Sequence, residues 1–135
     1  MMRFLLDTNA VITVLGQKSE PLISRVLECS EGEIAIPTIV SHELYFGAYK
    51  SQRVSFNLET IRLLLRDFAL LSFDEEDSRQ AGEVRAELKK SGTPIGPYDV
   101  LIAGQAKARD LILISNNTRE FERVSDLRLE DWTLS

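Results

Sequence analysis

Residues 3–9 read Arg-Phe-Leu-Leu-Asp-Thr-Asn, an apolar run that ends abruptly in small polar residues. Such a run is typical of a strand that is buried on both faces within a parallel sheet. Asp7 then falls at the carboxyl end of the strand, which is the edge where open parallel sheets bind ligands. The alternative is that Asp7 or Thr8 merely caps the following helix. The rest of the chain must decide between these roles.

Short apolar runs alternate with helical patterns along the remaining sequence. Strands are expected at residues 34–37, 69–73, 111–114 and 127–132. Helices are expected at residues 10–15, 21–30, 38–51, 58–68, 74–90, 98–109 and 118–123. Pro21 should open the second helix, and Thr38 or Ser41 should cap the third. This order predicts one α/β domain over residues 1–135, a sandwich with a mainly parallel central sheet flanked by helices.

Composition narrows the chemistry that the chain can perform. The formal charge of −5 argues against a broad basic surface for nucleic acid, so a polyanionic substrate would need help in binding. A divalent metal held by carboxylates is one source of that help, because it reverses the local sign of the field. His42 is the only histidine, which excludes a two-histidine ribonuclease and a three-histidine zinc site. Cys29 is the only cysteine, so no internal disulfide can form. We see no signal peptide or membrane span, and we expect a cytoplasmic protein.

Two further acids occupy unusual places in the pattern. Glu43 shares a helix face with Ile39 and Phe46, where a carboxylate is costly unless it is paired. A salt bridge or a less buried face would also explain it. Asp99 opens a helix after the rigid stretch Gly92–Pro97, where it could simply bond free backbone donors. With Asp7 and the polar turn at residues 115–117, these acids can converge at one edge of the sheet.

Charged clusters in the second half of the chain have simpler explanations. The acids of residues 74–77 lie where a helix starts, and they are expected to interact favourably with the helix dipole rather than to bind metal. The cations Arg85, Lys89 and Lys90 suit the end of that helix for the same reason. A second use for them, in contact with phosphate, stays open.

At this point the sequence resembles the PIN-domain ribonucleases, and more narrowly the VapC toxins of bacterial toxin-antitoxin modules. The resemblance spans essentially the whole chain. It rests on FLLDTN at 4–9, VSHELYFGA at 40–48, GTPIGPYDVLIAGQA at 92–106 and LILISNNTREFERV at 111–124. It implies a PIN-like sandwich and a metal-dependent endoribonuclease.

The resemblance also assigns residues to the site. The metal-binding and catalytic acids of the family correspond to Asp7, Glu43 and Asp99. The usual fourth acidic position corresponds to Asn117, which is a departure, and Glu120 is a candidate to replace the missing carboxylate. One firmly held metal is therefore expected rather than two. Supporting hydrogen-bonding groups are expected at Thr8, Asn9 and Ser115. Weaker candidates for phosphate contact are Arg85, Lys89, Lys90 and Arg119.

The implied chemistry is direct hydrolysis of RNA by water activated on Mg²⁺, or on Mn²⁺, leaving 5′-phosphate and 3′-hydroxyl ends. The expected substrate is the anticodon stem-loop of initiator tRNA, whose cleavage would inhibit translation. The expected partners are a second copy of the chain and a VapB-type antitoxin, in a toxin-antitoxin hetero-oligomer. DNA would be bound only indirectly, through the antitoxin.

Two other readings remain open from the sequence. A non-catalytic PIN-fold binding module would explain Asn117 and the low positive charge. A haloacid-dehalogenase-like phosphatase would also place Asp7 after its first strand, but Asn9 stands where that class has a second aspartate. An aspartyl-phosphate trapped on Asp7 would support the phosphatase.

Overall fold

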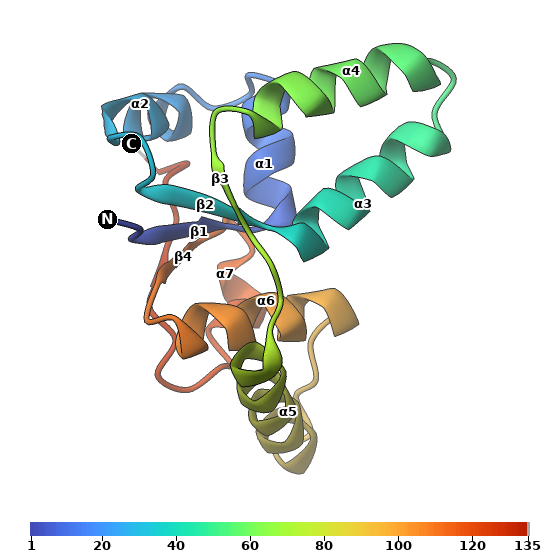
Figure 1. The fold of residues 1–135 in the computed structure, drawn as a ribbon. Helices are drawn as coiled ribbons and strands as arrows, with labels where there is room; N and C mark the ends of the chain where they lie inside the picture. Colours follow the sequence, from blue (N-terminus) through green and yellow to red (C-terminus); the bar gives the residue numbers. More distant parts are fainter. Residues whose placement is uncertain (135) are drawn as a thin grey trace.

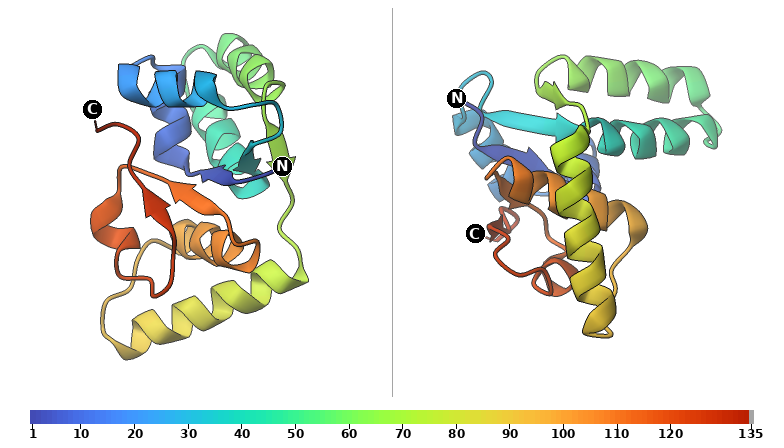
Figure 2. Two further views of the ribbon diagram at one scale, coloured as in Figure 1. Left: turned by 90° about the vertical axis from the view of Figure 1, so that its left-hand side faces the viewer. Right: turned by 60° about the horizontal axis from the view of Figure 1, so that its bottom comes forward.

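The computed structural model describes residues 1–134, which form a three-layer sandwich (Figure 1). The strands are β1 (Phe4–Leu6), β2 (Ile34–Pro37), β3 (Ala69–Leu71), β4 (Ile112–Ile114) and β5 (Leu129–Glu130). The helices are α1 (Thr8–Leu15), α2 (Glu20–Glu28), α3 (Thr38–Tyr49), α4 (Val54–Leu65), α5 (Glu75–Lys90), α6 (Pro97–Ala108) and α7 (Thr118–Phe121). Helices α1 to α4 cover one face of the sheet, and α5 and α6 cover the other (Figure 2).

The five strands form one sheet in the order β3-β2-β1-β4-β5, and every pair is parallel. The central strand β1 is fully buried, as its run of apolar residues predicts. The strand order reverses between β1 and β4, and in open parallel sheets this is the point of the carboxyl edge where ligands bind. Asp7 and Ser115 directly follow these two strands and so lie side by side at that edge.

The predicted sandwich and parallel sheet are confirmed, but several helix starts differ from the prediction. Helix α4 begins at Val54, four residues before the predicted start at residue 58, and α1 begins at Thr8 instead of residue 10. Pro21 is the second residue of α2, because Ser19 is the cap and its hydroxyl accepts from the Leu22 amide at 3.3 Å. Neither Thr38 nor Ser41 caps α3. Strand β2 runs directly into this helix, and Pro37 takes the cap position without a side-chain hydrogen bond.

The acidic residues at the start of α5 interact with the helix dipole as predicted in position, and two of them also form specific hydrogen bonds. Asp74 caps the helix, and the Asp77 carboxylate accepts from the Asp74 amide at 2.9 Å, which completes a capping box. Asp77 is also buried and accepts from Arg109 Nε at 3.0 Å and from Gln105 Nε2 at 2.9 Å. Because Gln105 and Arg109 lie at the end of α6, this network ties α6 to α5.

Close packing fixes the same pair of helices. A Cβ atom at Gly104 of α6 would lie 2.4 Å from the Ala81 Cα atom of α5, so only glycine permits this approach. Helix α6 carries Asp99 in its first turn. The packing of α6 on α5 therefore sets where Asp99 stands relative to the sheet edge.

No helix within residues 1–134 combines the length and the apolar character that a membrane crossing requires.

Candidate active site

Asp7 follows β1 directly and is only 2% exposed. Its Oδ1 atom accepts from the Ala10 amide at 2.8 Å, which caps α1, and its Oδ2 atom accepts from Ser115 Oγ at 2.5 Å. Its own amide donates to the Ile114 carbonyl at 3.2 Å. The sequence left open whether Asp7 is a helix cap or a site residue. The cap fixes the carboxylate at the carboxyl edge, so the two roles are compatible.

Ser115 extends this hydrogen-bonded chain toward α7. Its Oγ atom accepts from the Asn117 amide at 2.9 Å while it donates to Asp7. The Asn117 side chain in turn donates through Nδ2 to Glu120 Oε2 at 2.9 Å. Ser115 therefore supports Asp7 as expected. Asn117 positions Glu120, so both residues proposed for the fourth position belong to one network.

Glu43 projects from the second turn of α3 toward the start of α1. Its Oε1 atom accepts from Thr8 Oγ1 at 2.7 Å, which satisfies one oxygen of this half-buried carboxylate. No Lys or Arg among residues 1–134 forms an ion pair with it. The salt bridge considered for Glu43 from the sequence is thus absent from the described part of the chain, and the Thr8 hydroxyl holds the carboxylate.

Asp99 lies in the first turn of α6 and is half-buried. A Cβ atom at Gly96 would stand 3.3 Å from Asp99 Oδ2, tighter than most contacts of that kind, so glycine leaves room for the carboxylate. Burial and the neighbouring carboxylates of Asp7, Glu120 and Glu43 act together on Asp99. The fold therefore brings four acids from β1, α3, α6 and α7 to one edge of the sheet.

The acids share an environment that disfavours their charges. Burial raises the pKa of Asp7 to about 6, against the hydrogen bonds from Ser115 and Ala10, and Glu43 adds to the rise. Burial also raises the pKa of Asp99 to about 6, and the charges of Asp7, Glu120 and Glu43 add to it. No Lys or Arg of the described residues forms an ion pair with these four acids. Among the described residues, the cluster is therefore a concentration of negative charge that no Lys or Arg side chain pairs with.

Asp7→Asn is expected to stabilise the metal-free protein at neutral pH. The ordinary pKa of 3.8 applies in the unfolded chain, so between about pH 4 and 6 the folded Asp7 keeps a proton that the unfolded one releases. The free energy of unfolding should therefore fall as pH rises through this window, by about 3 kcal/mol for Asp7. Denaturant unfolding at pH 4.5 and 7 in chelator should register about 2 kcal/mol of this loss, because part of it already occurs below pH 4.5.

The exposed Asp126→Asn makes the same chemical change away from the acids and serves as the control. Asp126 has a positive φ of 61°, a conformation that Asn also tolerates. The control should lose stability with pH as the wild type does. An equal loss in Asp7→Asn would contradict the raised pKa.

The donor set fits a hard divalent cation, although the acids do not form a closed cage. All four side chains offer carboxylate oxygens, which Mg²⁺ and Mn²⁺ prefer. Within residues 1–134, no group of three or more His, Cys, Asp or Glu side chains is arranged so that it could hold a metal ion. Mg²⁺ commonly uses one or two carboxylates with water and substrate phosphate, and this set can supply them. The metal-ligand assignment of Asp7, Glu43 and Asp99 stays a prediction.

The remaining predicted residues have different surroundings. Asn9 is exposed, and its carbonyl accepts from Thr13 Oγ1 at 2.8 Å. Arg85 and Lys89 line a groove of about 680 Å³ between α5 and the segment that precedes α6. Lys90 and Arg119 are exposed. The phosphate contacts expected of these four cations stay predictions.

Sequence reasoning missed one acid near the site. Asp131 follows β5, and its charge contributes to the raised pKa of Asp7 after burial and the charge of Glu43. Its position after the last strand of a parallel sheet was a usable signal. Asp131 Oδ1 also accepts from the Thr133 amide at 2.8 Å, so this carboxylate makes a local hydrogen bond to the residues that follow it.

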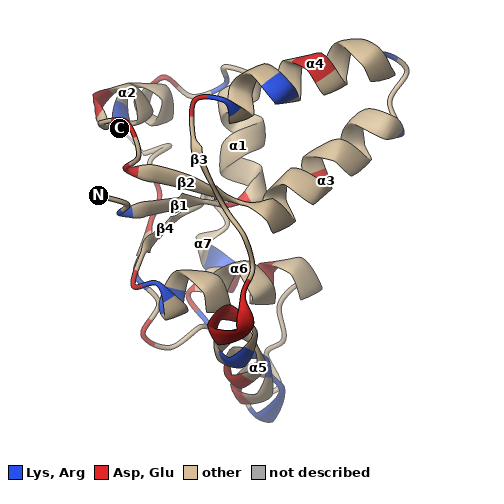
Figure 3. Ribbon diagram, viewed as in Figure 1, with Lys and Arg blue, Asp and Glu red and all other residues tan. Residues whose placement is uncertain are grey.

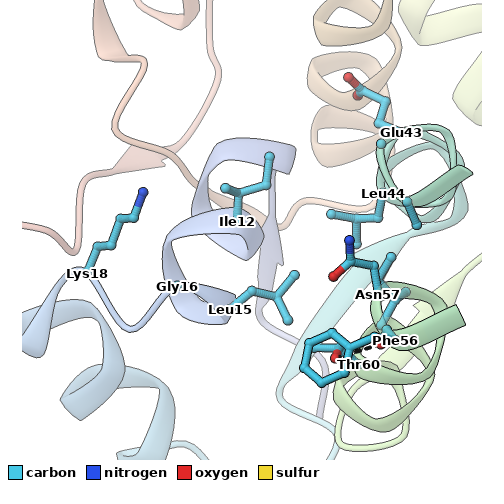
Figure 4. A pocket seen from close by; sticks show the side chains of 12 residues that line it. Ile12, Leu15, Gly16, Lys18, Glu43, Leu44, Phe56, Asn57 and Thr60 are labelled. Carbon is cyan, nitrogen blue, oxygen red and sulfur yellow. Dashed lines mark hydrogen bonds between the residues drawn. The ribbon is translucent and has the colours of Figure 1, made fainter. Parts of the chain in front are cut away.

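An apolar groove of about 450 Å³ adjoins the acids between α1, α3 and α4. Figure 4 shows Glu43 at one end of it, with Ile12 and Leu15 on the α1 side and Phe56 on the α4 side. Ile12 and Phe56 are about half exposed, at 48% and 55%. The groove thus offers apolar surface directly beside a carboxylate of the site.

Comparison with known proteins places this geometry in a family. The profile of the PIN domain matches residues 4–127. The chain is 41% identical over 133 residues to a Shigella flexneri protein named tRNA(fMet)-specific endonuclease VapC, covering 98% of this chain and 100% of that one. A Haemophilus influenzae protein named Ribonuclease VapC2 is 39% identical over 132 residues, covering 98% and 99%.

Solved structures agree with the sequence relatives. The chain superposes with a TM-score of 0.93 and 39% identity on a structure described as DNA-bound VapBC from Salmonella typhimurium, covering 98% of this chain and 99% of that one. A structure of VapBC2 from Rickettsia felis, described as bound to a DNA fragment from their promoter, gives a TM-score of 0.90 and 32% identity, covering 97% and 99%.

Proposed function

This chain belongs to the PIN-domain family, and from that premise we propose that it is an endoribonuclease toxin of a type II toxin-antitoxin system. The observation that carries the proposal is the convergence of Asp7, Glu43, Asp99 and Glu120 at the sheet edge without a paired cation. Such a cluster is costly for stability, which is typical of a site built for chemistry rather than for packing. The near full-length similarity to a VapC endonuclease supplies the substrate class, RNA.

Asp7 and Asp99, together with Glu43, are the residues that would hold Mg²⁺ or Mn²⁺, because burial and the neighbouring carboxylates disfavour the charges of the two aspartates until a cation is bound. When bound, the ion supplies a positive charge for the scissile phosphate and lowers the pKa of a water molecule. Ser115 holds the Asp7 carboxylate in place through its hydroxyl. Thr8 holds one oxygen of Glu43, which leaves the other oxygen to accept a proton from the attacking water.

Direct attack by water predicts products with 5′-phosphate and 3′-hydroxyl ends. The alternative, attack by the ribose 2′-hydroxyl through a cyclic phosphate, uses a pair of acid-base side chains such as two histidines. This chain has only His42. We propose the anticodon stem-loop of initiator tRNA as the substrate, since relatives carry the name tRNA(fMet)-specific endonuclease.

Cleavage of end-labelled initiator and elongator tRNAs by the antitoxin-free protein tests the proposal. The reactions contain Mg²⁺ or Mn²⁺, or chelator instead. Cleavage of the initiator alone, lost in chelator, is the expected result. Cleavage that survives chelator would refute the metal mechanism, and equal cleavage of both tRNAs would refute the narrow target. No cleavage of any RNA would favour a binding module.

We also propose a VapB-type antitoxin as the partner, in a hetero-oligomer that contains a homodimer of this chain. The solved relatives are described as VapBC complexes, some bound to DNA. The antitoxin would read the DNA, because this chain carries a formal charge of −5. A basic side chain of the antitoxin would compensate the uncompensated acids, and the apolar groove beside Glu43 would accommodate its apolar residues.

Glu120→Gln is expected to weaken Mn²⁺ binding about tenfold, because Glu120 supplies the fourth negative charge that Asn117 lacks. Asn117→Ala removes only the hydrogen bond that orients Glu120, so its effect should be smaller. Isothermal titration of the metal into each variant gives the affinities. The exposed Glu122→Gln, two residues along the chain, is the control. A larger loss in Asn117→Ala than in Glu120→Gln would assign the fourth position to Asn117.

A further inference from the structure

Helix α3 carries a stripe of aromatic side chains on the face that is turned away from the core. His42, Tyr45, Phe46 and Tyr49 are spaced at i, i+3, i+4 and i+7, which places them on one face of the helix. Tyr45, Phe46 and Tyr49 are 38%, 60% and 65% exposed. We call these four residues the aromatic stripe.

The opposite face of α3 already makes the packing contacts of the helix. Val40, Leu44 and Ala48 are buried there, on the side that faces the sheet and its neighbouring helices. The stripe is therefore not needed to hold α3 in the fold. Several large exposed rings in one row mark a surface that contacts another molecule.

The stripe is continuous with the candidate active site. His42 directly precedes Glu43, and Tyr98 directly precedes Asp99. The rings of His42 and Tyr98 pair with centroids 5.5 Å apart, which joins α3 to the start of α6 beside two of the acids. From there α3 extends outward, away from the sheet (Figure 1). A polymer that crosses the acids therefore meets the stripe on one side.

The charge of this region differs from that of the chain. Residues 44–58 contain no Asp or Glu and include Lys50 and Arg53, whereas the whole chain has a formal charge of −5. The α3–α4 hairpin carries these cations near its tip (Figure 3). Lys50 Nζ lies 4.9 Å from the ring centroid of Phe46, and Arg53 Cζ lies 3.9 Å from that of Phe56. Within residues 1–134, neither cation forms an ion pair.

We propose that the aromatic stripe, with Lys50 and Arg53, binds unpaired nucleotides of the RNA next to the bond that is cut. Bases stack on aromatic rings whatever their identity, and Lys and Arg neutralise the phosphates between them. A contact between two copies of the chain would need the rings but not the unpaired cations beside them. The inference rests on the proposed function for the identity of the polymer.

Fluorescence anisotropy with a labelled single-stranded RNA of about 12 nucleotides, in chelator, tests the stripe without cleavage. Tyr49→Ala and Phe46→Ala should each weaken binding about tenfold. In cleavage assays they should raise KM and leave kcat near the wild-type value, because the acids are untouched. Leu27→Ala, another exposed apolar residue, lies on α2 and should bind as the wild type does.

The salt dependence tests the cations separately from the rings. The double variant Lys50→Gln, Arg53→Gln should lower the slope of log affinity against log salt by about 1.4, the value for two phosphates of a single strand. Arg62→Gln on α4, where Arg62 pairs with Glu59, is the control with no expected change. An unchanged slope in the double variant would overturn the role of the two cations.

Analytical sedimentation of the same variants tests the alternative that the stripe joins two copies of the chain. Loss of a dimer in Tyr49→Ala with unchanged RNA affinity would overturn the proposal, since the stripe would then join two copies. The outcome also separates this inference from the proposed function. RNA that is cleaved normally and bound equally by all stripe variants refutes the stripe alone. RNA that is never cleaved, but is bound through the stripe, supports the stripe and refutes the nuclease.

Discussion

Replacing Asp7 with Ala is expected to lower the rate of RNA cleavage by at least about a thousandfold, which corresponds to roughly 4 kcal/mol of transition-state stabilisation. Asp7 is the most buried acid of the site, and its Oδ2 atom is oriented by the Ser115 hydroxyl at 2.5 Å. Removing it takes away a principal ligand for the divalent ion. Single-turnover cleavage of initiator tRNA with Mg²⁺ measures the loss.

The Ala variant also loses the cap of α1, which by itself costs about 1 kcal/mol of stability. Asp7→Asn separates the two effects, because an amide oxygen can still accept from the Ala10 amide. The Asn variant should be folded, more stable than the wild type at neutral pH without metal, and nearly inactive. Activity near the wild-type level in Asp7→Asn would remove Asp7 from the catalytic machinery.

Replacing Gly104 with Ala is expected to lower the free energy of unfolding by about 3 kcal/mol, the upper end of the usual cost of overpacking. The new Cβ would lie 2.4 Å from the Ala81 Cα and 2.6 Å from the Ala81 amide nitrogen, both backbone atoms that cannot rotate away. The helices α5 and α6 must therefore separate. Because α6 carries Asp99, cleavage should fall as well. Denaturant unfolding measures the stability.

Gly82→Ala is the matched control on α5. A Cβ at Gly82 meets no atom within 4 Å, and the residue is exposed within the helix. Alanine should therefore stabilise the protein by about 1 kcal/mol through its helix propensity. The two substitutions are chemically identical and differ only in their surroundings. Equal effects from both would show that α5 and α6 are not packed as described.

The sequence predicted best what depends on neighbouring residues. The run Phe4–Leu6 and the run Ile34–Pro37 are short, apolar and bounded by polar residues, so their strands were evident. The positions of Asp7 and Asp99 followed from their places after a strand and at a helix start. The prediction that Thr38 or Ser41 caps α3 was wrong for a local reason. No loop separates β2 from the helix, so the cap position falls on Pro37.

What the sequence could not predict are contacts between distant segments. Thr8 holds Glu43 across 35 positions, and Arg109 pairs with Asp77 across 32. Neither partner carries a local signal for the other. The link from Asn117 to Glu120 is local, but its meaning depends on Ser115 and Asp7, which only the paired strands bring together. The family resemblance predicted which acids form the site, whereas only the structure shows the hydrogen bonds that hold their carboxylates.

The pairing of β1 with β4 has a consequence for how the protein is made. The hydrogen bond from Ser115 to Asp7 joins residues that lie 108 positions apart. During synthesis Asp7 leaves the ribosome early, but Asp99, Ser115 and Glu120 follow only with the last third of the chain. A nascent chain therefore cannot assemble the acids until nearly all of it has been translated. A protein proposed to cleave tRNA therefore cannot form its active site before its own synthesis is almost complete.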